Sequence, residues 1–289
     1  MLKRVDLHTH STASDGTDTP AEVVRNAHKA GVSAVALTDH DTLAGLEEAQ
    51  AEARRLGDIE FVRGVEVSTG SDRGEMHILG LWVPEDATPL EKALNEMMLR
   101  RNDRNGRIID RLNSLGFNVT MDDVMAEAPG GTSVGRPHIA NALVRRGYAK
   151  NLKQAFDKFL APGGCAFIAK DVMDPIMAVR LMSRIGCSVV VAHPMLKPTP
   201  PGWIDDFIRK LVPHGLCGIE AWHSEHTEAD SRACIAIARR NRICVSGGSD
   251  YHGKNKPRIS LGTGYGSLFV TWDAYQLLRQ WRKDRGLPC

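Results

Sequence analysis

The chain has 289 residues, of which 42% are hydrophobic and 25% are charged, with a formal net charge of +2. This composition is ordinary for a globular protein, and the small net charge gives no argument for nucleic-acid binding by the field of the whole molecule. No apolar run reaches the ~18 residues of a membrane span, no signal-peptide pattern opens the chain, and the six cysteines form no CxxC pair. We therefore expect a cytoplasmic protein with reduced thiols and no membrane partner.

The first third of the chain alternates short apolar runs with helical stretches. The predicted elements are a strand at Arg4–His10, a helix at Pro20–Ala30, a strand at Ser33–Leu37, a helix at Leu43–Leu56, and strands at Ile59–Val67 and Glu75–Trp82. The alternation predicts parallel strands joined by crossover helices. The last of these strands is expected to be the antiparallel or neighbouring partner of the one before it.

The pattern becomes helical from about Leu90 to Lys170, and strands resume at Cys187–Ala192. The elements that follow are a helix at Trp203–Val212, a strand at Gly218–Trp222, a helix at Glu228–Arg240, strands at Ile243–Ser246 and Ser267–Thr271, and a C-terminal helix. We predict an α/β fold in which residues 1–89 and 171–289 form a βα barrel. Residues 90–170 are expected to form an inserted helical domain for substrate binding.

Histidine and acidic residues recur where the predicted strands end. His8 and His10 lie one residue apart in a strand, so their side chains project to the same side. The other residues at or just past strand ends are His40, Glu66, His193, Asp250 and His252. The carboxyl ends of barrel strands share one face, where residues distant in sequence meet. A single histidine in such a place is more often a hydrogen-bonded loop residue, but the repetition favours a site for divalent metals.

Together, these motifs resemble those of the PHP (polymerase and histidinol phosphatase) superfamily, in the family's order. The motifs are His8-x-His10, Asp15, Thr38-Asp39-His40, Glu66, His77, His193-Pro194 and Asp250-x-His252. The resemblance implies a distorted seven-stranded, TIM-like βα barrel that holds three divalent ions per chain, with Mn²⁺ the first choice. It assigns one ion to His8, His10, Glu66 and Asp250, a second to the bridging Glu66 with His77 and His193, and a third to Asp15, His40 and His252. Nitrogen and oxygen donors without thiolate also suit Fe²⁺ or Zn²⁺.

Two polar segments of the insertion are candidates for substrate binding. An apolar helical face is interrupted by Arg101, Asn102, Asp103, Arg104 and Asn105, which either form a frayed, solvated segment around Gly106 or contact a ligand. The stretch Ser133–His138 contains Gly135, Arg136 and His138 at the start of a helix. This is either an ordinary capped helix or an anion site. It resembles the Gly-x-Arg-Pro-His signature of one PHP branch, the nucleoside 3′,5′-bisphosphate phosphatases and RNA 5′-end exonucleases.

Hydrolysis of a phosphate ester is the reaction that this centre predicts, because adjacent metals activate water and neutralise phosphoryl charge. His223, just after a predicted strand, is our candidate catalytic residue that contacts the scissile phosphate or protonates the leaving oxygen; the alternative is an ordinary loop histidine. We expect removal of the 3′-phosphate from nucleoside 3′,5′-bisphosphates such as adenosine 3′,5′-bisphosphate. The alternatives are a 5′-to-3′ exonuclease on short 5′-phosphorylated RNA, a histidinol-phosphate phosphatase, and a non-catalytic polymerase-associated module. No obligate protein partner is predicted.

Overall fold

The computed structural model describes residues 3–127, 134–169 and 171–289, so Ser133 and Lys170 lie outside the described residues. The chain divides into two compact units. The barrel unit comprises Met1–Lys92 and Val172–Cys289, and the helical unit comprises Ala93–Asp171. Among the described residues, no helix has the length and apolar character needed to cross a lipid bilayer.

The barrel unit is built on one eight-stranded sheet with the order β7-β6-β5-β4-β3-β2-β1-β8. Its strands are β1 (Arg4–Asp6), β2 (Val32–Leu37), β3 (Glu60–Ser71), β4 (Gly74–Leu81), β5 (Ser188–Val191), β6 (Leu216–His223), β7 (Cys244–Gly248) and β8 (Val270–Thr271). Strands β1 to β3 are parallel, as are β5 to β7, whereas β4 is antiparallel to both β3 and β5. The two-residue connection Asp72-Arg73 between β3 and β4 explains this reversal, because parallel neighbours need a long crossover.

The sheet closes into a barrel just beyond β1 and β7. Leu7 N donates to Gly247 O at 3.2 Å, and Asp250 N donates to His8 O at 2.9 Å. Gly248 permits this close approach, since a Cβ atom there would lie 2.4 Å from the backbone nitrogen of His8. Strands β1 to β7 thus form the barrel, and the short β8 pairs with β1 at the opposite end of that strand. The predicted distorted seven-stranded βα barrel is confirmed, with an eighth strand attached to it.

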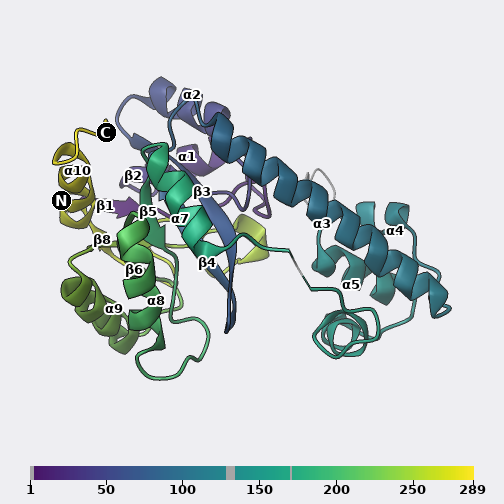
Figure 1. Cartoon of the computed structure of the whole chain (residues 1–289). Helices are drawn as coiled ribbons and strands as arrows, with labels where there is room; N and C mark the ends of the chain where they lie inside the picture. The colour runs from purple at the N-terminus through teal and green to yellow at the C-terminus, as the bar shows by residue number, and fades with distance from the viewer. Residues whose placement is uncertain (1–2, 128–133, 170) are drawn as a thin grey trace. The chain divides into compact units, whose positions relative to one another are not determined.

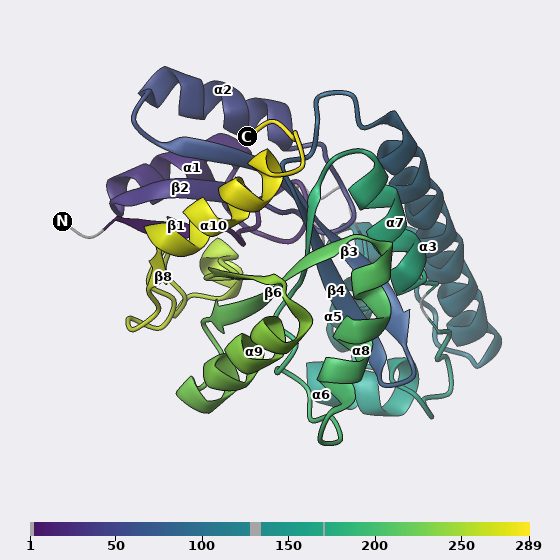
Figure 2. The same ribbon diagram turned by 60° about the vertical axis from the view of Figure 1, so that its left-hand side comes forward.

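In the described part of the chain, α-helices pack around the sheet (Figures 1 and 2). They are α1 (Pro20–Lys29), α2 (Leu46–Leu56), α7 (Pro175–Arg184), α8 (Trp203–Leu211), α9 (Glu228–Asn241) and α10 (Trp272–Lys283), with short 3₁₀ turns η2 (Val212–His214) and η3 (Gly253–Asn255). Helix α1 packs on β2, α2 on β3, α9 on β6 and α10 on β7. Helix α7, absent from the sequence prediction, starts at an Asp-Pro pair: Asp174 caps it by accepting from Met177 N at 3.0 Å. These helices bury the outer face of the sheet and leave its carboxyl end for the site.

The helical unit has its own core. Its elements are most of α3 (Thr88–Ser114), then α4 (Met121–Met125), α5 (Arg136–Arg145), α6 (Leu152–Ala155) and the π-helix η1 (Phe156–Leu160). Ile108, Leu112, Ile139, Leu143 and Phe159 are fully buried in this core. Helix α3 continues through Gly106, so the segment is not frayed, although Asn102 and Asp103 are exposed to solvent.

Candidate metal centre

The histidine pair after β1 lies on one side of an extended segment. The Nε2 atoms of His8 and His10 are 3.1 Å apart, and both residues are fully buried. Each Nε2 lies 3.2 Å from Oε2 of Glu66. Oδ1 of Asp250 lies 3.6 Å from Nε2 of His8 and 3.2 Å from Nε2 of His10. Four donor atoms, from β3 and from the segments that follow β1 and β7, therefore converge on one point.

Glu66, on β3, lies at the centre of the cluster. Its Oε1 lies 2.8 Å from His77 Nδ1 and 2.9 Å from His193 Nε2. Its Oε2 lies 3.1 Å from His40 Nδ1, in addition to the His8 and His10 contacts. Since the two oxygens face different sets of imidazoles, this one carboxylate can serve two neighbouring ions.

A third group forms around Asp15. Asp15 Oδ1 lies 3.2 Å from His252 Nε2 and 3.7 Å from His10 Nδ1, and its Oδ2 lies 3.8 Å from His40 Nε2. The Nδ1–H of His252 donates to Asp250 O at 2.8 Å, which turns Nε2 towards Asp15. All nine residues assigned as ligands from the sequence thus lie in one cluster within the barrel unit.

Further buried carboxylates hold the loops that carry these side chains. Asp39 accepts from Ser11 N at 2.8 Å and from Ser14 Oγ at 2.6 Å, which fixes the turn leading to Asp15. Asp6 accepts from Ser249 N at 2.8 Å and so fixes the residue before Asp250. These aspartates position loops, because their oxygens are used by backbone amides and hydroxyls.

Two of the clustered residues adopt backbone conformations that side chains rarely take. The φ of His193 is 25° and that of Asp250 is 57°. Each such residue costs of order 1–3 kcal/mol and persists where its surroundings fix it. Here the His193 N–H donates to Oε2 of Glu220 at 2.7 Å, and the Asp250 N–H donates to His8 O. Strain of this kind clusters at functional sites.

The electrostatics show how strongly acids and imidazoles depend on each other. Burial lowers the pKa of His10, but Asp250, Glu66 and Asp15 outweigh it and raise the pKa to about 10. Burial also lowers the pKa of His77, but Glu66 and Glu75 outweigh this effect and raise the pKa to about 9. Burial also raises the pKa of Glu66, but the surrounding imidazoles hold it well below its usual range. In contrast, burial lowers the pKa of His40 to about 4 and also lowers that of His193, so the imidazoles of the cluster do not all favour the protonated form.

The donor set fits divalent ions. Among the described residues, Oε2 of Glu66 and Nδ1 of both His10 and His40 are buried without a hydrogen-bond partner. Three groups have ligand atoms within 4.8 Å of one another: His10, Asp15, His40 and His252; His8, His10 and Glu66; and His40, Glu66 and His77. Imidazole and carboxylate donors without thiolate suit Mn²⁺, Fe²⁺ or Zn²⁺.

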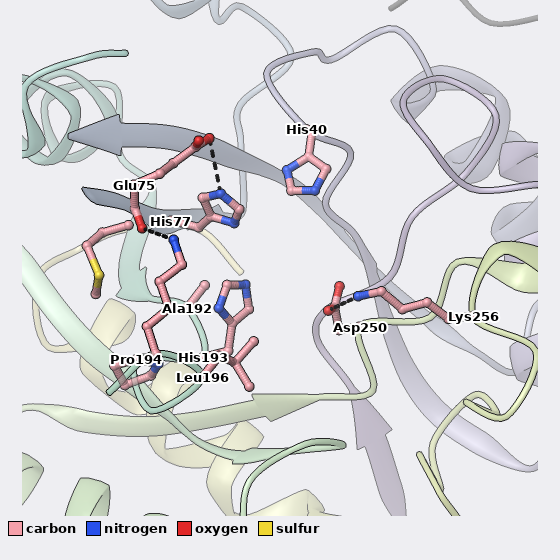
Figure 3. A pocket seen from close by; sticks show the side chains of 11 residues that line it. His40, Glu75, His77, Ala192, His193, Pro194, Leu196, Asp250 and Lys256 are labelled. Carbon is pink, nitrogen blue, oxygen red and sulfur yellow. Dashed lines mark hydrogen bonds and ion pairs between the residues drawn. The ribbon is translucent and has the colours of Figure 1, made fainter. Parts of the chain in front are cut away.

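A pocket of about 200 Å³ opens on this cluster. In Figure 3, His40, His77 and His193 border it, and Asp250 lies on its other side, paired with Lys256. Lys256 Nζ contacts Asp250 Oδ2 at 2.6 Å. A second cation, Lys197, also lines the pocket and donates to Glu75 O at 2.8 Å. Neither lysine is a candidate site residue in the sequence analysis. The only sequence feature that could have indicated them is their position, since Lys197 follows His193-Pro194 and Lys256 follows Asp250-x-His252.

His223 also lies within the cluster. Its side chain is fully buried and its Nε2 is 3.4 Å from Asp250 Oδ2. Its Nδ1 accepts from Glu225 N at 3.1 Å, so we assign the proton of the neutral ring to Nε2. The pairing of β6 with β7 shifts register between Glu220 and Trp222. Such a bulge re-aims side chains near active sites, and here Glu220 and His223 both face the centre.

The predicted substrate-binding residues lie in the helical unit. Arg104 and Asn105 are buried, Arg101 is half-buried, and Asn102 and Asp103 are exposed. Asn105 Nδ2 donates to Val134 O at 2.9 Å, which joins the two polar segments within this unit.

The start of α5 is capped by the side chain of His138, a residue of the same helix. His138 Nδ1 accepts from Gly135 N at 3.1 Å, and Arg136 donates to Leu160 O at 3.3 Å. These contacts describe an ordered helix start, and the anion-binding role of this segment stays a prediction.

Curated proteins of similar sequence include three enzymes whose names describe phosphoesterases or nucleases. A phosphoribosyl 1,2-cyclic phosphate 1,2-diphosphodiesterase from Eggerthella lenta is 37% identical over 86% of this chain and 94% of its own. A 5′-3′ exoribonuclease from Haemophilus influenzae is 34% identical over 87% of this chain and 91% of its own. A 3′,5′-nucleoside bisphosphate phosphatase from Chromobacterium violaceum is 32% identical over 90% of this chain and 91% of its own.

The solved structures include an amidohydrolase from Chromobacterium violaceum with a TM-score of 0.80. It is 30% identical and the match covers 96% of both chains. The model of the PHP domain family matches residues 6–156, which carry five of the candidate ligand motifs from His8 to His77. The sequence, the barrel and these relatives agree, and the chain belongs to the PHP domain family.

Proposed function

We propose that this protein is a metal-dependent phosphatase that removes the 3′-phosphate of nucleoside 3′,5′-bisphosphates and leaves the 5′-monophosphate. The observation that carries the proposal is the arrangement around Glu66, whose two oxygens face five imidazoles at 2.8–3.2 Å. When bound there, divalent ions supply an activated water and neutralise the charge of the phosphoryl group. This chain provides their ligands and the groups that handle the substrate.

His223 is suited to act on the leaving oxygen. Because its Nδ1 is occupied by the Glu225 N–H, its Nε2–H points towards Asp250 and the cluster. A donor held in this way can give a hydrogen bond or a proton to the oxygen that leaves phosphorus. Lys256, with its ammonium at the same carboxylate, adds positive charge beside the pocket and favours an anionic substrate.

The pocket and the relatives together limit the substrate. A pocket of about 200 Å³ is smaller than the ~300–1,000 Å³ that enclose a drug-sized ligand. It therefore suits the reacting phosphoryl group rather than a complete nucleotide. The relatives' named substrates each contain a phosphorylated ribose, which is the common element in our choice. The assignment of the second phosphate to Arg101–Asn105 and Gly135–His138 stays a sequence-based prediction.

Two relatives support two further candidates from the same reaction class. The exoribonuclease relative supports 5′-to-3′ trimming of short RNA, and the cyclic phosphate diesterase relative supports a phosphoribosyl cyclic phosphate. Both reactions cleave a phosphate ester of ribose and use the same metal chemistry. They differ in product, and the products decide between them.

Product analysis tests the proposal directly. Protein loaded with Mn²⁺ is given adenosine 3′,5′-bisphosphate, a 5′-phosphorylated oligoribonucleotide, phosphoribosyl 1,2-cyclic phosphate and histidinol phosphate in separate reactions. We expect the highest kcat/KM for the bisphosphate, with inorganic phosphate and adenosine 5′-monophosphate as products. Preferred release of mononucleotides or of a ribose bisphosphate assigns the corresponding alternative. Hydrolysis of histidinol phosphate alone overturns the proposal.

A further inference from the structure

Glu220 is a buried carboxylate that lies behind the candidate ligands. It occupies the middle of β6, is fully buried, and is flanked by Ile219 and Ala221. A charged group in such a strand needs partners, because burying an unpaired charge is costly. The structure supplies two, and both belong to residues of the candidate metal centre.

The first partner is the ring of His8. Glu220 Oε1 lies 3.0 Å from His8 Nδ1, on the side of the ring away from the cluster. An ionised carboxylate only accepts, so the ring donates from Nδ1. His8 Nε2 is then left to face Glu66, His10 and Asp250. A carboxylate that fixes a ligating histidine in this way sets both its tautomer and its orientation.

The second partner is the backbone of His193. Glu220 Oε2 accepts from His193 N at 2.7 Å. That residue has the strained φ of 25°, and its Nε2 contacts Glu66 Oε1 at 2.9 Å. The hydrogen bond therefore holds a strained ligand in place. His8 and His193 face different oxygens of Glu66, so Glu220 connects two parts of the cluster.

From this geometry we infer that Glu220 is a positioning residue that couples two metal sites: it sets the tautomer of His8 and the backbone of His193 with one carboxylate. The inference rests on the proposed metal-dependent function. Loss of a partner that orients a ligand weakens metal binding by ~10–100-fold. Because Glu220 orients residues on both oxygens of Glu66, its loss should weaken two ions rather than one.

Glu220→Gln tests this with little change of shape. The His193 N–H cannot change from donor to acceptor, so the glutamine oxygen pairs with it and the NH₂ group faces His8 Nδ1. His8 is then favoured with its proton on Nε2, the atom needed by the ion. Glu52→Gln is the matched control, since the Glu52 carboxylate pairs with Arg25 and Arg55 on the outer helices.

The measurements are the number and affinity of bound ions, by chelator competition and elemental analysis, and the ¹⁵N resonances of His8 in Zn²⁺-loaded protein. We expect ~10–100-fold weaker binding of two ions and a changed His8 signal in Glu220→Gln, with Glu52→Gln like wild type. If Glu220→Gln binds every ion as wild type does, the inference is overturned and the proposed function stands.

Failure of the proposed function and failure of the inference about Glu220 give different results. Wild-type protein that binds no divalent ion refutes the proposed function itself. If Glu220→Gln does not fold, Glu220→Asp takes its place, because a shorter carboxylate cannot reach both His8 and His193. Undiminished affinity for both ions in Glu220→Asp then contradicts the coupling.

Discussion

Replacing Glu66 by glutamine is the sharpest test of the proposed metal centre. The substitution keeps the shape of the side chain but leaves one oxygen where two now face separate sets of imidazoles. The residue is fully buried, so solvent cannot replace the lost charge. Breaking a buried ionic contact by removing one partner costs about 3–5 kcal/mol. At about 1.4 kcal/mol per factor of ten, we expect metal affinity to fall by roughly 10² to 10⁴.

The assay is competition for Mn²⁺ with a chelator of known affinity, followed by phosphate release at saturating metal. Glu52→Gln is again the matched control, because its carboxylate pairs with Arg25 and Arg55 on the helices outside the cluster. We expect this control to bind Mn²⁺ within tenfold of wild type. A Glu66→Gln protein that keeps both wild-type stoichiometry and affinity refutes the reasoning, because a shared carboxylate cannot be dispensable.

Three further predictions concern His223, the protonation of His10 and His77, and Arg136. His223→Asn should lower kcat by roughly 10²–10⁴ without changing the metal content, whereas His226→Asn should stay near wild type; an unchanged kcat in His223→Asn removes the leaving-group role. The pKa values of His10 and His77, about 10 and about 9, lie above the ordinary 6.5. Their protons therefore stabilise the metal-free protein below pH ~6.5, and this stability is lost as pH rises through 9–10. The Tm of the metal-free protein should fall over that pH range. Loading with Mn²⁺ at pH 7.5 should release protons, which calorimetry in two buffers measures. Zero proton release contradicts the assigned protonation. Arg136→Ala should raise KM far more for a bisphosphate than for a single-phosphate ester, and equal increases place Arg136 outside the substrate site.

Local patterns were sufficient to predict the barrel. The Thr19-Pro20 start of α1 and the Gly57 end of α2 are visible in the sequence, and the structure shows the capping box and the left-handed glycine that they imply. The direction of β4 was left open because period-two patterning does not distinguish parallel from antiparallel pairing. Its two-residue connection to β3 decided it. The strand expected at Ser267–Thr271 is limited to Val270–Thr271, since only those residues pair with β1.

The candidate site shows what a single sequence cannot supply. The positions of His8, Glu66 and Asp250 at predicted strand ends indicated that they lie close together, because βα topology alone brings those ends together. Glu220 was invisible, since a glutamate inside an apolar strand gives no hint of which side chain it faces. Its role depends on the bulge after it and on the closure of the barrel beside it. Both arise from tertiary pairing over long sequence separations.

Barrel closure has a consequence for how the protein matures. Ser249 N donates to Asp6 Oδ1, its partner 243 positions away, at the seam where His8 meets Asp250. In contrast, His40, which follows β2, pairs with Glu66 on the neighbouring strand β3 through an isolated bridge. Contacts between distant segments form late during folding. During synthesis on the ribosome, the growing polypeptide therefore contains part of the ligand set before the seam can form. We expect the highest affinity for divalent ions only once the barrel has closed.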